Sequence, residues 1–390
     1  MTPQEISYIL NELGEDREDY FNAVAPPIIQ TSNFAFRTVA ELRQAFEDEY
    51  KNLIYSKGMN PTVNILRKKL AALDNAEDCL VLNSGSSAIF ASVFANVQSG
   101  DHIVSVNRPY SWAKRLFDEV LPRFGVATTY VDGREIESFE RAILPSTKII
   151  YLESPKRWDY ALQDLRAVAD LAKAEGIITI CDNSYCTPLF QRPLDLGIDI
   201  SLQSATKYIG GHSDVLAGVL TGTRSMMAHV FANAMQNAGN GISPFNAWLL
   251  LRGLRTLPAR LDRCTATTRQ LVDWLKGHPK VEQVIFPFDP SFSQYELAQK
   301  QMSGACGLVT IVVRAKKMEE IVTFCESLRH ILMAVSWGGH ESLVIPRCAS
   351  LQPEAYDSAD PEHRMLRFYF GLEDADYLKS DLDQAFMAMV

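Results

Sequence analysis

The sequence predicts an α/β fold in which a mainly parallel central sheet carries helices on both faces, with a smaller α+β domain at the C-terminal end. From Pro61 to about residue 203, short apolar runs alternate with amphipathic stretches, and this alternation is typical of βαβ units. The apolar runs have few polar interruptions, as expected for strands that are covered on both faces. The chain of 390 residues is long enough for roughly two or three domains.

Residues 1–60 are expected to form an arm rather than a domain. The amphipathic segments at 5–13 and 39–49 predict short helices, whereas Pro26-Pro27 between them forbids one. An arm with this much apolar character needs a surface to pack on. A neighbouring subunit is the natural candidate, and packing on its own chain is the alternative.

Residues 61–250 carry the predicted βαβ pattern, and residues 251–390 form the smaller domain. A long helical stretch that begins at Ile242 leads from one to the other. The strands expected in the larger domain are 79–82, 102–106, 126–131, 148–153, 176–182 and 199–203, and its clearest helices are 64–75 and 162–176. The smaller domain is expected to contain strands near 281–286, 307–313 and 365–370 and helices near 316–328 and 374–389.

The composition excludes several classes of partner. A net charge of −9 and a pI near 5.4 argue against a nucleic-acid surface, which requires basic patches. No apolar run approaches the ~20 residues that span a bilayer, and the acidic, mixed N-terminal residues resemble neither a signal peptide nor a transit peptide. The seven cysteines are scattered without a C-x-x-C pair, so we expect reduced core cysteines in a cytoplasmic protein that has no zinc site.

The stretch from Asp199 to Ala217 carries the strongest indication of chemistry. A short apolar run there ends in a turn that contains Ser204, Thr206 and Lys207, and a glycine pair follows. A lysine at the carboxyl end of a strand opens onto the crevice where α/β sheets bind ligands, and the neighbouring hydroxyl and N–H groups can hold a phosphate beside the amine. This pattern favours a lysine that forms an imine with an aldehyde cofactor. The alternative is a surface lysine.

Two further groups follow other strands of the same predicted sheet. Gly85 and Ser86 lie where a strand turns into a helix, whose N–H groups form a ready anion site; a plain serine N-cap is the alternative. Asp182 closes another strand and can pair with a protonated pyridine nitrogen, or else serve as a turn or capping acid. Because the carboxyl ends of parallel strands meet in one crevice, these residues and Lys207 together predict a site for pyridoxal 5'-phosphate.

Longer motifs support this cofactor. Two stretches resemble motifs of the Cys/Met-metabolism family of pyridoxal-phosphate enzymes, the trans-sulfuration enzymes. The lysine motif of the family resembles SATKYIGGHSDVLAG, and its aspartate motif resembles CDNSYCTPLFQRPLDLGIDI. The resemblance extends from APPIIQTSNFAF near residue 25 through RGLRTLPAR and SWGGHESL to FGLEDADYLKSDLDQAF at the end. Within the family, the chain is most similar to bacterial cystathionine β-lyase. The resemblance implies a fold-type-I, aminotransferase-like fold in which residues 61–250 bind pyridoxal phosphate.

The resemblance also implies roles for individual residues. Lys207 would be the Schiff-base lysine that shuttles the α-proton, Asp182 would bind the pyridine nitrogen, and Tyr110 would stack on the cofactor ring and assist proton transfer. Arg367 would take the substrate α-carboxylate, with Ser336 beside it; a surface charge at a strand edge is the alternative for this arginine. The implied phosphate ligands are Gly85, Ser86, Ser204 and Thr206, joined by Tyr55 and Lys57 from the neighbouring subunit.

Four departures from the family pattern bear on cofactor and substrate. Lys57 stands where arginine is usual, and lysine lacks the guanidinium fork. Val335 replaces the tyrosine of the β-lyase-like pattern, and Tyr369 replaces a serine. The usual small, asparagine-containing loop is Lys156-Arg157-Trp158 here. Close to the cofactor, this bulky cationic loop would favour a substrate with an extra anionic group; the alternative is a loop that faces outward.

The activity that the resemblance implies is that of a carbon–sulfur β-lyase, which cleaves cystathionine or a related cysteine thioether to a thiol, pyruvate and ammonia. The first alternative is a γ-lyase or γ-replacement enzyme of the same family, of the cystathionine γ-lyase, cystathionine γ-synthase or O-acylhomoserine sulfhydrylase type. The second is a non-catalytic binding protein on the same fold, which would be expected to have lost the lysine. Family members are usually homotetramers, built as dimers of dimers with shared active sites.

Overall fold

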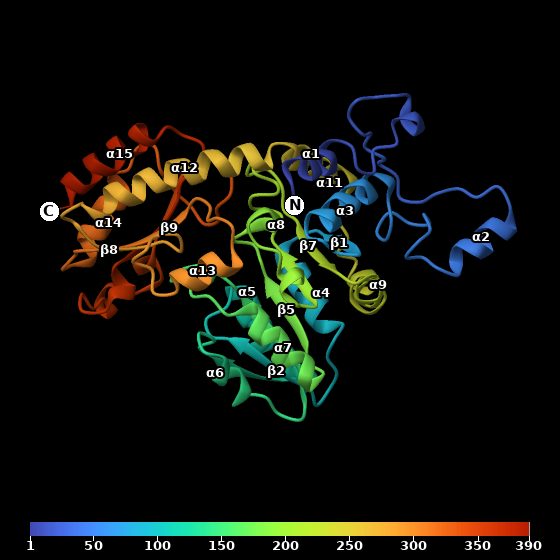
Figure 1. Ribbon diagram of the computed structural model, residues 1–390, viewed down its shortest axis with the longest axis horizontal. Coiled ribbons are helices and arrows are strands. Elements are labelled where there is room, and N and C mark those ends of the chain that lie inside the picture. The colour runs from blue at the N-terminus through green and yellow to red at the C-terminus, as the bar shows by residue number, and fades with distance from the viewer. Residues whose placement is uncertain (390) are drawn as a thin grey trace. The chain divides into compact units, whose positions relative to one another are not determined.

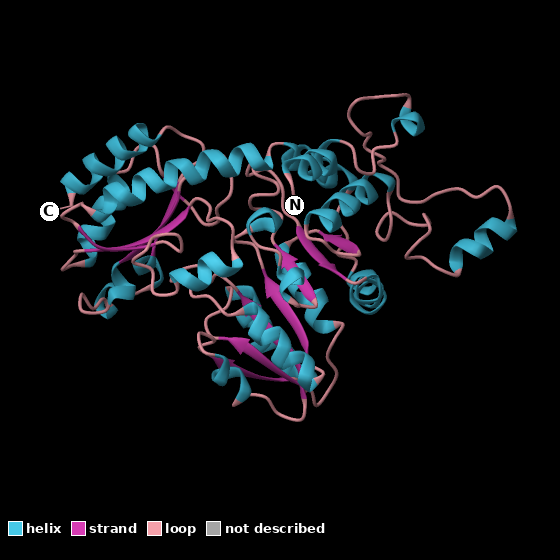
Figure 2. Cartoon of the chain, viewed as in Figure 1, coloured by secondary structure: helices cyan, strands magenta, loops and turns pink. Residues whose placement is uncertain are grey.

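A computed structural model describes residues 1–389 of the chain (Figures 1 and 2). The chain forms two compact units. Unit 1 comprises residues 1–155, 161–210 and 214–255, and unit 2 comprises residues 156–160 and 211–213 and the described chain from Thr256 onward. The boundary after Arg255 follows the long helical stretch that the sequence indicates, and two short segments cross from the first part of the chain into unit 2.

The helices and strands of unit 1 alternate along most of its length. Its strands are β1 (Asp78–Leu82), β2 (His102–Val106), β3 (Ala127–Val131), β4 (Thr147–Glu153), β5 (Ile178–Asp182), β6 (Ile200–Gln203) and β7 (Gly218–Gly222). Its α-helices are α1 (Pro3–Asn11), α2 (Val39–Phe46), α3 (Pro61–Leu73), α4 (Gly85–Phe94), α5 (Ser111–Arg115), α6 (Ile136–Glu140), α7 (Leu165–Glu175), α8 (Thr187–Phe190), α9 (Arg224–Val230), α10 (Gln236–Ala238) and α11 (Pro244–Arg255). Short 3-10 or π turns are η1 (Arg17–Tyr20), η2 (Leu116–Val120), η3 (Leu121–Phe124), η4 (Pro193–Leu196) and η5 (Phe231–Met235).

The sheet of unit 1 confirms the predicted mainly parallel topology. In the described residues its order is β1-β7-β6-β5-β4-β2-β3, and every neighbouring pair is parallel except those that involve β7. The sequence did not predict β7, because glycines begin and end it and glycine disfavours strands. The structure shows why glycine is needed at its start: a β-carbon on Gly218 would lie 2.1 Å from the carbonyl oxygen of Ser84.

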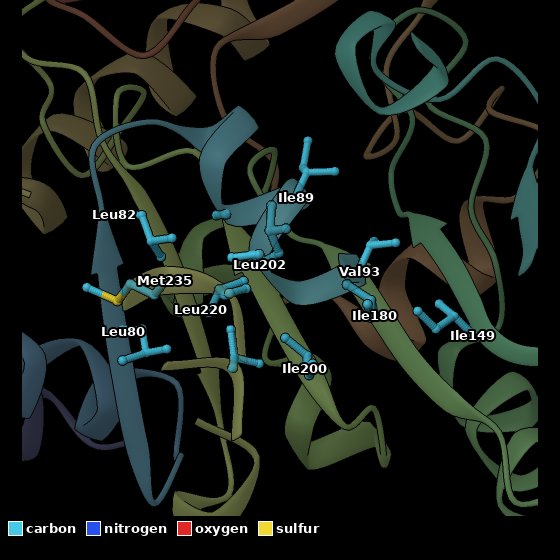
Figure 3. Close-up of a cluster of buried hydrophobic side chains, with 14 of the residues drawn as sticks. Leu80, Leu82, Ile89, Val93, Ile149, Ile180, Ile200, Leu202, Leu220 and Met235 are labelled. Carbon is cyan, nitrogen blue, oxygen red and sulfur yellow. The ribbon is translucent and has the colours of Figure 1, made fainter. Parts of the chain in front are cut away.

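Apolar side chains cover both faces of this sheet, as predicted. On one face, residues such as Ile149, Ile180 and Leu202 pack with Ile89 and Val93 of α4 (Figure 3). On the other face, the alternate residues of the same strands pack against α7; these include Val104, Ile150, Leu152 and Cys181 with Leu165 and Val168. Each fully buried aliphatic side chain contributes about 1.5–3 kcal/mol through removal from water. The strand ends are therefore held in fixed positions.

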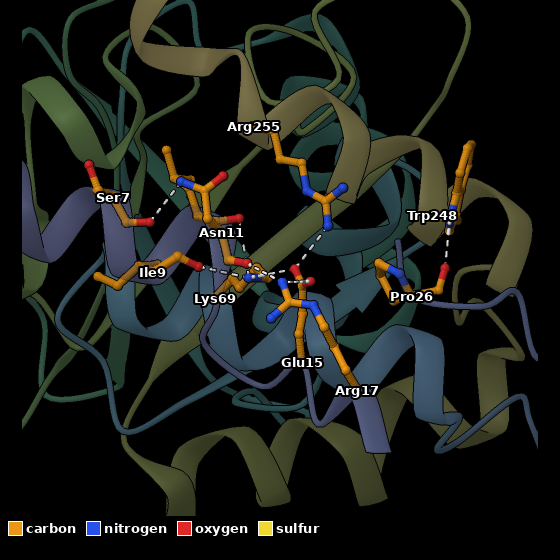
Figure 4. Close-up of polar contacts among 10 residues, drawn as sticks. Ser7, Ile9, Asn11, Glu15, Arg17, Pro26, Lys69, Trp248 and Arg255 are labelled. Atoms are coloured by element: carbon orange, nitrogen blue, oxygen red, sulfur yellow. Dashed lines mark hydrogen bonds and ion pairs between the residues drawn. The ribbon is translucent and has the colours of Figure 1, made fainter. Parts of the chain in front are cut away.

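A buried ionic cluster attaches the N-terminal helix to unit 1. The Glu15 carboxylate accepts from Lys69 of α3 at 3.1 Å and from Arg255 of α11 at 3.0 Å, while Lys69 also donates to the carbonyls of Ile9 and Leu10 at the end of α1 (Figure 4). Burial lowers the pKa of Lys69, and its bond to Glu15 opposes that shift. This part of the predicted arm therefore packs on its own chain.

Farther along, the arm exposes large apolar side chains. Phe21 is 99% exposed, and Val24, Val39 and Phe46 are also exposed. The Trp248 indole donates to the Pro26 carbonyl oxygen at 3.0 Å, which is one of the points where the arm is fixed to unit 1. Exposed side chains of this kind leave room for the predicted contact with a neighbouring subunit, which stays a prediction.

Unit 2 is a smaller α+β unit. Its helices are α12 (Leu257–Lys276), α13 (Tyr295–Gln301), α14 (Met318–Ser327) and α15 (Ala375–Ala388), its strands are β8 (Val281–Ile285), β9 (Leu308–Val313), β10 (Leu332–Met333), β11 (Leu343–Pro346) and β12 (Met365–Tyr369), and its 3-10 turns are η6 (Arg347–Ser350), η7 (Pro353–Ala355) and η8 (Pro361–Arg364). Within the described chain the sheet order is β10-β11-β12-β9-β8, with only the β10–β11 pair parallel. The three predicted strands and two predicted helices are present, whereas β10 and β11 were not predicted, since both are very short.

Two predictions about the chain as a whole can be compared with the structure. All seven cysteines lie in the described residues and are buried, and none of them forms a disulfide there, which confirms them as core residues. Over residues 1–389, no helix combines the length and the apolar character that crossing a membrane requires.

Candidate active site

Asp182 lies at the carboxyl end of β5, in register with Leu202 of the parallel strand β6. It is 8% exposed, and its Oδ1 accepts from the backbone N–H of Ser184 at 3.0 Å. The Ser184 hydroxyl in turn accepts from the backbone N–H of Ser204 at 2.6 Å. Asp182 thus acts as a turn acid, and the turn that it stabilises is bonded directly to the start of the lysine loop.

Lys207 sits in a tight turn directly after β6. Its backbone N–H donates to the carbonyl oxygen of Ser204 at 3.1 Å, and the residue is partly buried. Helix α11 packs closely against the same loop at Gly253. A β-carbon at that position would lie 2.4 Å from the carbonyl oxygens of both Ile209 and Gly210. The loop is therefore braced by backbone contacts on either side of the lysine.

The first turn of α4 approaches the same loop. Ser84 is the N-cap, and its hydroxyl accepts from the Ser87 N–H at 3.1 Å. The N–H groups of Gly85 and Ser86 belong to the first turn, where an α-helix has no internal acceptor for them. A β-carbon on Gly85 would lie 3.0 Å from the Ser204 Oγ. The serine cap and the anion site are thus compatible, because the cap uses a different N–H group.

Thr206 is the predicted phosphate ligand whose hydroxyl already has protein partners. Its Oγ1 donates to the Ala217 carbonyl oxygen at 3.2 Å and accepts from the Ala217 N–H at 3.0 Å. A hydroxyl has one proton to donate. For Thr206 to donate to a phosphate, its hydroxyl has to give up the bond to the Ala217 carbonyl, whereas Ser204 has no such constraint in its contact with Gly85.

Tyr110 is held by a residue that the sequence analysis did not single out. It precedes α5, and its backbone N–H donates to Glu153 Oε2 at 2.6 Å. Glu153 ends β4 and is in register with Asp182 of β5. The available signal was a carboxylate at the end of a predicted strand beside the strand that carries Asp182. Glu153 places Tyr110 at the same edge of the sheet as Asp182.

Tyr55 and Lys57 lie in the arm, away from the strand ends in sequence. Tyr55 forms an isolated β-bridge with Asn33 and is 52% exposed. The Lys57 ammonium donates to the Gln236 carbonyl oxygen at 3.2 Å. Both residues therefore have contacts within unit 1, and about half of Tyr55 is exposed.

Arg367 lies in unit 2, on the interior strand β12, where it is paired with Ile345 of β11 and Thr310 of β9. It is 5% exposed, so the alternative of a surface charge at a strand edge is wrong. Its Nη1 donates to the Arg157 carbonyl oxygen at 3.3 Å, and its guanidinium carbon lies 5.3 Å and 5.1 Å from the ring centroids of Trp158 and Trp337.

The loop that contains Ser336 is also part of unit 2. Ser336 has a φ of 89°, which is uncommon for a residue other than glycine and marks a locally strained backbone. The Tyr369 hydroxyl donates to the Gly339 carbonyl oxygen at 2.7 Å, and the ring is buried. Tyr369, a departure from the family pattern, therefore supports the loop that follows Ser336. Val335, by contrast, is 78% exposed.

The Lys156-Arg157-Trp158 segment packs onto the sheet of unit 2. Lys156 is 5% exposed, and Trp158 is half-buried, with its ring contacted by the guanidinium groups of both Arg367 and Arg347. The segment is fixed at its far end by the Thr310 hydroxyl, which donates to the Tyr160 hydroxyl at 3.0 Å. The outward-facing alternative is therefore wrong for Lys156 and Trp158.

The residues of unit 1 fit pyridoxal phosphate. A carboxylate suited to a protonated pyridine nitrogen, a lysine amine, and a helix N-terminus suited to a phosphate come from segments that are bonded or pressed together. The close approach at Gly85 allows the helix N–H groups and the Ser204 hydroxyl to share one anion. The donor set thus matches the three parts of the cofactor.

Comparisons with known proteins agree with this chemistry. Residues 9–387 match the family model described as Cys/Met metabolism PLP-dependent enzyme. An L-methionine gamma-lyase of Treponema denticola is 38% identical over 95% of this chain and 94% of that protein. An O-succinylhomoserine sulfhydrylase of Pseudomonas aeruginosa is 35% identical over 93% of this chain and 90% of that protein.

Among solved structures, the crystal structure of metB from Corynebacterium glutamicum superposes with a TM-score of 0.89 at 31% identity, over 99% of this chain and 98% of that chain. The likeness confirms the predicted fold-type-I architecture. The family match over nearly the whole chain confirms pyridoxal 5'-phosphate as the cofactor and carbon–sulfur lyases as the class of enzyme. The chain belongs to the family of Cys/Met-metabolism enzymes that depend on pyridoxal phosphate.

Proposed function

We propose that this enzyme breaks the bond between Cγ of an amino-acid substrate and its sulfur or oxygen substituent, releasing a thiol or an acid together with 2-oxobutyrate and ammonia. The relatives support this proposal most directly, because those named above are a methionine γ-lyase and an O-succinylhomoserine sulfhydrylase, each aligned over more than nine-tenths of this chain. They favour the γ-type alternative over the β-lyase that the motifs first implied. The motifs around Lys207 are shared by both activities and do not separate them.

Bound pyridoxal phosphate supplies an electron sink for charge that develops at the substrate Cα. We assign to Asp182 the role of pairing with the pyridine nitrogen, a charge-assisted bond of about 1.5–3 kcal/mol. Lys207 would hold the cofactor and, once released, move the α-proton between Cα and its own Nζ. Tyr110, fixed through Glu153, would lie against the ring and assist this proton transfer.

The remaining contacts would orient cofactor and substrate. We assign the phosphate to Gly85, Ser86 and Ser204, with Thr206 joining if its hydroxyl turns from Ala217. Arg367 would bind the substrate α-carboxylate, and Ser336 would lie beside it. A fixed carboxylate sets the orientation of the bond to the α-proton, which is how positioning speeds proton transfer.

We also retain the domain and assembly predictions as proposals. Residues 61–250 would bind the cofactor, residues 251–390 would form the smaller domain, and residues 1–60 would contact a neighbouring subunit. In that assembly, a dimer of dimers, Tyr55 and Lys57 would complete the phosphate site of the partner. A cytoplasmic location fits such an enzyme of amino-acid metabolism.

A second candidate is γ-replacement, in which a thiol or sulfide takes the place of the departing group. The sulfhydrylase among the relatives supports it at an identity close to that of the γ-lyases. Both reactions need the same early proton transfers by Lys207. They differ in what is added at Cγ after the substituent leaves: a thiol or sulfide in γ-replacement, and a proton in γ-elimination, which is followed by hydrolysis to 2-oxobutyrate and ammonia.

Product analysis tests the proposal. Purified enzyme is incubated with L-methionine, L-cystathionine and O-succinyl-L-homoserine, with and without sulfide, and the products are identified by mass spectrometry. We expect 2-oxobutyrate, and homocysteine where replacement occurs. Pyruvate from cystathionine without 2-oxobutyrate would restore the β-lyase and overturn the proposal.

The role of Lys207 has its own test. Borohydride reduction of the wild-type enzyme, followed by peptide mapping, should place the cofactor on Lys207. Lys207→Ala should abolish turnover, while Lys173→Ala, a change of an exposed lysine in α7, should leave it intact. A colourless protein that takes up no pyridoxal phosphate would instead support the non-catalytic alternative.

A further inference from the structure

The ring of Trp158 contacts two guanidinium groups. The guanidinium carbon of Arg367 lies 5.3 Å from the ring centroid, and that of Arg347 lies 4.9 Å from it. The separation of the two guanidinium carbons therefore cannot exceed the sum of these two distances. Cation–π contacts of this kind stabilise by roughly 0.5–2 kcal/mol each. One aromatic side chain thus contacts two positive charges.

Sheet geometry fixes this arrangement. Arg347 directly follows β11, and β11 is paired with β12 so that Ile345 lies opposite Arg367. The carbonyl oxygen of Arg157 accepts from Arg367, which fixes the residue before Trp158 to the same strand. Strand register therefore fixes the backbone positions from which the two arginines extend, and both side chains meet at the ring of Trp158.

Arg347 differs from Arg367 in its access to solvent. Arg367 is 5% exposed, whereas the side chain of Arg347 is 30% exposed. Arg347 pairs with Glu362 at 3.4 Å, and the side chain of Glu362 is 37% exposed. Partly exposed pairs of this kind contribute about 0–1 kcal/mol. An incoming carboxylate that is held elsewhere by a second contact can therefore compete with Glu362 for Arg347.

We propose that Arg347 and Trp158 form a second anion subsite, which binds a carboxylate at the far end of the substrate side chain while Arg367 binds the α-carboxylate. The inference rests on the proposed function, since it assumes that Arg367 takes the α-carboxylate. The substrate class is then a γ-substituted amino acid whose leaving group ends in a carboxylate. Methionine lacks such a group. The bulky cationic loop at 156–158, a departure from the family pattern, thereby selects for charge in the departing group.

A matched pair of substrates tests the subsite. O-succinyl-L-homoserine and O-acetyl-L-homoserine share the ester oxygen at Cγ, and only the succinyl group ends in a carboxylate. We expect Arg347→Gln to raise KM for the succinyl ester about tenfold, because a hydrogen bond to a charged group is lost, and to leave KM for the acetyl ester unchanged. Arg347→Lys should give an intermediate value, since it keeps the charge and loses the fork.

Arg329→Gln is the control, because Arg329 is an exposed arginine in unit 2. An equal effect of Arg347→Gln on both esters, or none on either, overturns the subsite; melting temperatures of the variants show whether an equal loss reflects misfolding. Turnover of L-methionine but of neither ester overturns the subsite alone, whereas no turnover of the esters, L-methionine or L-cystathionine means that the proposed function fails instead. The subsite is then tested by titration calorimetry of the two esters, where only tighter binding of the succinyl ester, lost in Arg347→Gln, supports it.

Discussion

Gly85 and Ser204 approach so closely that a β-carbon on the glycine would lie 3.0 Å from both the Cβ and the Oγ of the serine. Gly85 opens α4 after β1, and Ser204 follows β6, which is more than a hundred residues later in the chain. The antiparallel strand β7 lies between β1 and β6. The contact brings a helix N-terminus and a hydroxyl to one point, which is where we place the cofactor phosphate.

This contact predicts the effect of a single methyl group. Gly85→Ala should push Ser204 away and raise the dissociation constant of pyridoxal phosphate about tenfold, because one hydrogen bond to the charged phosphate is weakened. Fluorescence titration of the apoenzyme measures the constant. Gly277→Ala is the control, since its β-carbon would lie 3.7 Å from its nearest neighbour, an ordinary contact. If both variants bind pyridoxal phosphate equally tightly, Gly85 is not part of the phosphate site.

Asp182→Asn tests the proposed bond to the pyridine nitrogen. The amide keeps the shape of the side chain and an oxygen for the Ser184 N–H but loses the negative charge. We expect kcat/KM to fall about ten- to hundredfold, in line with 1.5–3 kcal/mol for a charge-assisted bond, and the absorbance band of the bound cofactor to shift. Asp170→Asn, on the exposed side of α7, should change neither property. An unshifted band in Asp182→Asn would argue that the carboxylate has only its turn role.

Asp74 predicts a pH dependence of stability that is independent of catalysis. It caps α3, and its carboxylate accepts from the Thr221 hydroxyl of β7. Burial raises the pKa of Asp74 from 3.8 to about 6, and the bond to Thr221 opposes that shift. The folded state therefore binds the proton more tightly than the unfolded state does. The stability that this group contributes is present at low pH and is lost as the pH rises from about 4 to about 6.

The asparagine side chain in Asp74→Asn cannot ionise, so the variant does not lose stability through this group as the pH rises. The difference in free energy of unfolding between the variant and the wild type should move in favour of the variant across that interval and level off above pH about 6. Urea midpoints measured from pH about 4 to about 7 give the difference. A constant difference over the whole range would show that Asp74 does not titrate there.

Mixed oligomers test whether Tyr55 and Lys57 act across a subunit interface. Lys207→Ala should be inactive, and so should the double variant Tyr55→Phe, Lys57→Ala. When the two are co-expressed, some active sites would combine an intact Lys207 with an intact arm from the neighbour, and activity should return. Hetero-oligomers that are shown by mass spectrometry to form and yet stay inactive would place both residues in the site of their own chain.

Much of the fold follows from local patterns. The strands that precede Gly85, Asp182 and Lys207 are short apolar runs ending in polar turns, and the helices between them have a continuous apolar stripe. The strand β7 escaped prediction, because Gly218 is required by a contact with Ser84 and weakens the local strand signal. Glu153 was overlooked for a similar reason, since its bond to Tyr110 joins two distant segments.

The sequence by itself indicated the cofactor, the candidate lysine Lys207 and most of the strands and helices, because the motifs and apolar patterns that carry them are short stretches of neighbouring residues. Only the tertiary structure decided how these residues meet. It decided that Gly85 touches Ser204, that the Thr206 hydroxyl is bonded to Ala217, and that Arg367 is buried against Trp158 instead of lying at a sheet edge. Such contacts depend on strand register and packing between segments far apart in sequence, which no local pattern encodes.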